Sequence, residues 1–132
     1  KGEMRHLIPV FLLLAFSVSS TAETIFIGVP MSKTELSGDN VARTTLNATA
    51  QQEFQVVIVE EGGRYFWKTR EMKELERQES GIYVTYQAVD GSGYVRIGSL
   101  TAIDSNTTQD ISYIEHLKLG LSTITYQGRA RK

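Results

Sequence analysis

The chain has 132 residues, and its 14 lysine and arginine residues nearly balance its 15 aspartate and glutamate residues, for a formal net charge of -1. This length suits one domain with one hydrophobic core. The charge balance does not indicate the basic surface typical of nucleic-acid-binding proteins, so no nucleic-acid partner is expected. There is no cysteine, which excludes disulfides, thiolate metal sites and thiol catalysis.

Residues 4–22 have the three-part organisation of a secretory signal peptide. A positive start at Arg5 is followed by the apolar run 7–18 and by small residues that include Ser20 and Ala22. A membrane-spanning helix needs about 20 apolar residues, so this run is too short for a permanent anchor. We therefore expect export followed by cleavage of the leader.

The leader predicts both the organisation and the location of the protein. Residues 1–22 are expected to comprise a few residues ahead of the natural start and the signal peptide, and residues 23–132 a single small domain. A secreted, most naturally bacterial periplasmic, location fits a cysteine-free chain, because small exported eukaryotic domains usually carry disulfides. Apolar packing alone must then stabilise the fold.

The first half of the domain is expected to begin with a strand over residues 25–29, ended by Pro30. Residues 31–52 are polar, and the one helical indication there is Asp39 or Asn40 as a cap. A strand over residues 54–60 follows.

Paired glycines then mark the first hairpin. Gly62 and Gly63 readily adopt the positive φ of a tight turn, which joins residues 54–60 to a returning strand over residues 64–68. After it, Thr69 can cap a short helix over residues 70–79. Gly81 would end this helix, and Arg70 and Glu74 lie at helical spacing within it.

The second half is expected to be all strand. Residues 82–100 alternate as a hairpin around a glycine-containing turn at residues 90–93. Residues 111–119 fit a strand or a helix, and we favour a strand, with a bulge or bend at Gly120 and a last strand over residues 121–127. The predicted class is α+β, mainly antiparallel meander and hairpins with one short helix at about residues 70–79.

One loop resembles the calcium-binding loop of the EF-hand family. Oxygen-bearing side chains recur at alternate positions of this loop, and a glutamate closes it: Asp104, Asn106, Thr108, Asp110 and Glu115. In the family such side chains converge on one ion, and the final glutamate supplies two oxygens. The resemblance covers this loop alone, and Gln109 replaces the family's glycine. The alternative is a connecting loop whose side chains bond their own backbone.

Three other residues are candidates for ligand binding. Trp67 and Arg70 lie where a strand meets the expected helix, and a guanidinium can grip an anionic group in a fork. For Trp67 itself, the favoured interpretation is a buried anchor. His116, the only histidine beyond the leader, would be a general base if a carboxylate oriented it. Its neighbour Glu115 would lie on the opposite face of a strand.

Three functional hypotheses remain open. The favoured one is an exported binding or protein-interaction domain that uses a sheet face or an edge strand, with an envelope protein or a small ligand as partner. The second is a small periplasmic hydrolase that uses His116 with a carboxylate. The third is a module that calcium stabilises through residues 104–115. No cofactor is expected.

Overall fold

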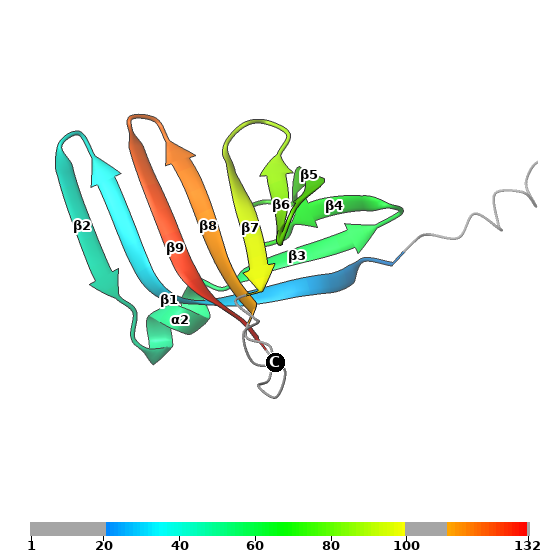
Figure 1. Cartoon of the computed structure of the whole chain (residues 1–132), viewed down its shortest axis with the longest axis horizontal. Helices are drawn as coiled ribbons and strands as arrows, with labels where there is room; N and C mark the ends of the chain where they lie inside the picture. Colours follow the sequence, from blue (N-terminus) through cyan, green and yellow to red (C-terminus); the bar gives the residue numbers. More distant parts are fainter. Residues whose placement is uncertain (1–20, 100–110, 132) are drawn as a thin grey trace, which may run out of the picture.

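The computed structural model describes residues 21–99 and 111–131, which form nine antiparallel strands and one short helix. Eight strands close into a barrel in the order β1-β3-β4-β5-β6-β7-β8-β9, and β9 pairs back with β1 (Figure 1). The α+β class predicted from the sequence is therefore wrong, because the domain is almost entirely β. The elements are β1 (Glu23–Ser37), β2 (Asn40–Thr45), α2 (Ala48–Glu53), β3 (Val56–Glu61), β4 (Arg64–Trp67), β5 (Lys73–Ser80), β6 (Tyr83–Ala88), β7 (Gly93–Ser99), β8 (Ile111–Leu119) and β9 (Ser122–Ala130).

Strand β1 closes the barrel because it is long enough to pair with three strands. Its first half pairs with β3, and its second half pairs with β9 on one edge and β2 on the other. The register shifts after Thr24 and after Pro30, and such irregularities bend a strand. Figure 1 shows β1 crossing the base of the barrel and then turning along β9. Pro30 thus lies within the strand that it was expected to end.

Helix α2 begins after Asn47, whose side chain accepts a hydrogen bond from the Ala50 amide at 2.9 Å. This is the usual role of an asparagine N-cap. The caps expected from the sequence, Asp39 and Asn40, instead lie in the β1–β2 turn and at the start of β2. Across residues 21–99 and 111–131, no helix has the length and hydropathy of a membrane span.

The helix predicted over residues 70–79 is not formed. Glu71 and Met72 have φ values of 58° and 55°, which end any helical path, and β5 follows directly. Leu75 on β5 is buried opposite Ala88 of β6. A strand is needed here to join β4 to β6, and this pairing overrides the helical preference of the lysine, glutamate and arginine side chains.

Both predicted hairpins are confirmed. Gly62 and Gly63 have φ values of 61° and 80° in the β3–β4 turn, and β6 and β7 pair around the second glycine-containing turn. Residues 111–119 are a strand, as favoured. Gly120 lies in the tight turn between β8 and β9, so it is part of the hairpin connection.

Large side chains fill the barrel interior, as is usual in small barrels. Two glycines make room for the largest of them. A Cβ atom at Gly28 would lie 2.5 Å from the Tyr113 ring, and one at Gly93 would meet the His116 carbonyl oxygen and lie 3.1 Å from the Trp67 ring. The buried hydrophobic cluster comprises Leu46, Val56, Ile58, Trp67, Leu75, Tyr86, Ala88, Val95, Tyr113, Leu117 and Tyr126.

Candidate functional site

Glu115 joins Trp67 and Arg70 inside the barrel. The Trp67 indole Nε1 donates to Glu115 Oε2 at 2.8 Å, and the Arg70 guanidinium donates to both carboxylate oxygens at 3.2 Å. Both Glu115 and Trp67 are 0% exposed. The structure thus brings together two of the predicted ligand-binding residues, around an acid that the sequence analysis had placed in the calcium loop. Its position between the inward-facing Tyr113 and Leu117 is the signal that could have identified it.

Burial dominates the electrostatics of this cluster. It raises the pKa of Glu115 above the ordinary value of 4.5, and the bonds from Arg70 and Trp67 offset only part of that rise. Burial also acts to lower the pKa of Arg70, but the bond to Glu115 reverses this and leaves it raised. The net contribution of a buried ion pair to stability is small, but removal of one partner leaves the other uncompensated. The cluster therefore fits a structural role for Trp67 as a buried anchor.

Arg70 also lines a hollow of about 250 Å³ at this end of the barrel, together with Lys73, Ser92 and Lys118. Two of the cations that line this hollow already have a carboxylate partner. Arg70 is paired with Glu115, and Lys73 Nζ lies 3.1 Å from Asp90. An incoming anion would have to compete with these carboxylates.

His116 does not join the cluster, because it points to the outside of β8. Its ring stacks on Tyr94 with centroids 5.2 Å apart, and its Nδ1 lies 2.9 Å from Thr125 Oγ1. Burial, with a smaller effect from Lys118, lowers its pKa, which favours a neutral imidazole at pH 7. The hydrolase hypothesis requires a carboxylate at this ring, and none of the described residues supplies one through a hydrogen bond or ion pair.

The four strands around His116 form a continuous outer face, defined here as the outward side chains of β6, β7, β8 and β9. Cross-strand pairs such as Thr85 with Arg96 and His116 with Thr125 place these side chains on one side. None of the outward residues of these strands is an aspartate or a glutamate. They are Tyr83, Thr85, Gln87, Tyr94, Arg96, Gly98, Ser112, Ile114, His116, Lys118, Thr123, Thr125, Gln127 and Arg129.

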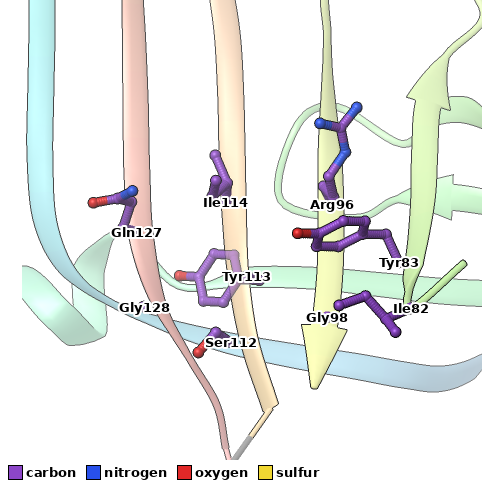
Figure 2. Close-up of a pocket in the computed structure, with 9 residues that line it drawn as sticks. All are labelled: Ile82, Tyr83, Arg96, Gly98, Ser112, Tyr113, Ile114, Gln127 and Gly128. Carbon is purple, nitrogen blue, oxygen red and sulfur yellow. The ribbon is translucent and has the colours of Figure 1, made fainter. Parts of the chain in front are cut away.

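A groove of about 350 Å³ lies on this outer face (Figure 2). Figure 2 shows the Tyr83 ring beside Arg96, with Ile114 and Gln127 on the two neighbouring strands. The Tyr83 ring can pack against this position of β7 because Gly98 has no side chain. A Cβ atom there would lie 2.9 Å from Tyr83 Cδ1. The groove thus combines aromatic, aliphatic, amide and cationic groups.

Among the described residues, neutral groups and no carboxylate hold Arg96 in place. Its guanidinium lies over the Tyr94 ring, 5.1 Å from the centroid, and its Nε donates to Thr85 Oγ1 at 3.1 Å. Arg64 on β4 offers a direct comparison, since it lies 5.4 Å from the Phe66 centroid but donates to both oxygens of Glu74, at 2.7 and 3.0 Å. Both guanidinium groups thus lie over an aromatic ring, but only that of Arg64 bonds a described carboxylate.

The calcium loop falls mostly outside the described residues, which include none of Asp104, Asn106, Thr108 and Asp110. Glu115, its last candidate ligand, points inward, and Trp67 and Arg70 bond both of its oxygens. Within the part of the chain that is described, no group of three or more histidine, aspartate or glutamate residues could hold a metal ion. Calcium binding stays a prediction from the sequence.

No protein-family model, curated protein or solved structure matches this chain. A closed small barrel supports many functions. Function is therefore inferred from the chemistry of the outer face and of the buried cluster.

Proposed function

We propose that the protein is a small exported binding domain, not an enzyme, and that the outer face of β6 to β9 is its binding surface. The observation that carries this proposal is that Arg96 is held in position but is not paired with a described carboxylate. Its guanidinium is held by the Tyr94 ring and the Thr85 hydroxyl, and no described carboxylate neutralises it. A cation that is already positioned loses little conformational entropy when a ligand binds.

The shape and composition of the groove support the same proposal. Ligand sites are concave and mostly apolar, with a few placed polar groups. Here Tyr83 and Ile114 supply apolar surface, while Arg96 and Gln127 supply polar groups beside it. All four lie on paired strands, and sites built on strands hold their geometry better than sites built on loops.

The buried cluster supports this choice by contrast. The barrel interior is occupied by side chains such as Trp67 and Tyr113, and the acid there is already bonded to Trp67 and Arg70. The export part of the proposal depends on the signal-peptide pattern of residues 4–22.

A ligand screen read by ¹⁵N NMR tests this function. We expect the hits to shift the backbone amides around Arg96 on β6 to β9, and to lose affinity in Arg96→Ala while keeping it in the matched control Arg64→Ala. Hits that shift only the barrel end around Arg70 and Lys73, or a broad screen without hits, would overturn the proposal.

A further inference from the structure

We infer that the ligand of the outer face is an anionic polysaccharide, one in which sugar rings carry carboxylates. This inference rests on the proposed function and adds the chemical class of the ligand. Three properties of the outer face lead to it: its charge, its neutral hydrogen-bonding side chains and the placement of Tyr83 beside Arg96.

The outer face differs from the other described strands, which carry aspartate or glutamate side chains beside many of their cations. Several cations elsewhere in the described residues pair with an acid: Lys33 with Glu35, Arg64 with Glu74, Arg70 with Glu115, Lys73 with Asp90, and Arg77 with Glu79. The outer face carries the cations Arg96 and Lys118, and none of the outward residues of its four strands is an aspartate or a glutamate. A surface of one sign attracts ligands of the opposite sign and rejects those of its own.

Between these cations the outer face is rich in neutral side chains that both donate and accept hydrogen bonds. They are hydroxyl or amide groups on β6, β8 and β9: Thr85, Gln87, Ser112, Thr123, Thr125 and Gln127. Such groups match the many hydroxyls of a sugar chain, each of which is also a donor and an acceptor. A purely charge-based contact would not need them.

Tyr83 and Arg96 together suit one acidic sugar unit. Tyr83 is 47% exposed, and Gly98 lies against its ring, so part of the ring is open to the C–H face of a pyranose. Arg96 lies two residues further along the β6–β7 pair than Tyr83, because it pairs with Thr85. Two residues along a strand span about 7 Å, so a sugar on Tyr83 can place its carboxylate at the guanidinium.

Single-stranded nucleic acid is the competing anionic polymer. It also combines rings with negative charge, but its affinity depends on neutralising successive phosphates with several cations. The cations of the outer face are separated by neutral side chains, and the formal net charge of the chain is -1. These features favour the sparser charge of a uronate chain.

The test titrates the protein with two uronate oligomers, oligogalacturonate and oligomannuronate, and with the methyl ester of the former, which keeps the sugars and removes the charge. We expect at least one uronate oligomer to shift the amides of β6 to β9. For an oligomer that binds, we expect the affinity to fall at least tenfold in Arg96→Ala and in Tyr83→Ala and to stay unchanged in Arg64→Ala. If oligogalacturonate binds, its methyl ester should also bind at least tenfold more weakly. Unchanged melting temperatures confirm that the variants fold.

Equal binding of the ester, unchanged affinity in Arg96→Ala, no binding of either uronate, or tighter binding of oligo-dT would each overturn this inference. These outcomes do not by themselves overturn the proposed function. If another ligand shifts the same amides when uronates do not, the outer face is still a binding surface and only the ligand class is wrong.

Discussion

Trp67 and Glu115 are connected by a 2.8 Å hydrogen bond across the barrel interior, between β4 and β8. Both side chains are fully buried. Because the indole N–H has this carboxylate as its partner, the loss of the acid would leave a buried donor unpaired. The bond therefore links the packing of the core to one ionisable group.

Glu115→Leu is expected to destabilise the protein by about 3 kcal/mol. The substitution leaves the buried Trp67 indole N–H without an acceptor and removes the partner of Arg70. Glu115→Gln retains an amide oxygen for the indole and should cost clearly less. Urea denaturation of both variants measures the difference. A Leu variant as stable as the wild type would contradict the assigned role of the acid.

The same residue predicts a pH dependence. Folding raises the pKa of Glu115 above 4.5, so the folded state binds this proton more tightly than the unfolded chain. The resulting stabilisation is complete below the unfolded pKa and is lost as the pH rises through the folded pKa. Wild type should therefore gain stability relative to Glu115→Gln as the pH falls from 8 towards about 4. A relative loss on acidification would show that Arg70 outweighs burial.

Gly93→Ala is expected to destabilise the barrel by about 3 kcal/mol, because overpacking in a filled core forces side chains or backbone to move. The added Cβ would meet the His116 carbonyl oxygen and the Trp67 ring. Gly98→Ala on the same strand is the control, since its Cβ would meet mainly the ring of Tyr83, which is half exposed and can shift. Similar melting temperatures for the two variants would argue against the close approach at Gly93.

Tyr113→Phe is expected to be neutral or to stabilise by about 1 kcal/mol. The Tyr113 hydroxyl is buried without a hydrogen-bond partner in the described structure, and burial raises its pKa. Removing an unpaired buried polar atom eliminates its desolvation cost. A loss of more than about 1 kcal/mol in thermal or urea unfolding would show that the hydroxyl is bonded in solution.

Local signals explain which parts of the fold could be predicted from sequence. Gly62 and Gly63 specify their hairpin by backbone conformation alone, and the alternation around Tyr113 specifies a strand. The segment after Arg70 has a helical composition, and only its pairing with distant strands makes it β. Likewise, nothing near Pro30 shows that β1 continues to pair with β9 on the other side of a register shift.

The candidate sites show the same limit. The structure brings Trp67 and Arg70 together, as their closeness in sequence suggests, but the acid between them lies 45 residues from Arg70 along the chain. His116 lies apart from them, against Tyr94 and Thr125, since adjacent residues on a strand face opposite sides. The outer face itself depends on the order of four strands, which sequence alternation alone does not provide.

The most direct test of the outer face as a binding surface compares two arginines that both lie over an aromatic ring. Calorimetric titration of a uronate oligomer should give at least tenfold weaker binding to Arg96→Ala than to wild type, and unchanged binding to Arg64→Ala, whose guanidinium is already paired with Glu74. Equal affinities for the two variants would contradict the account.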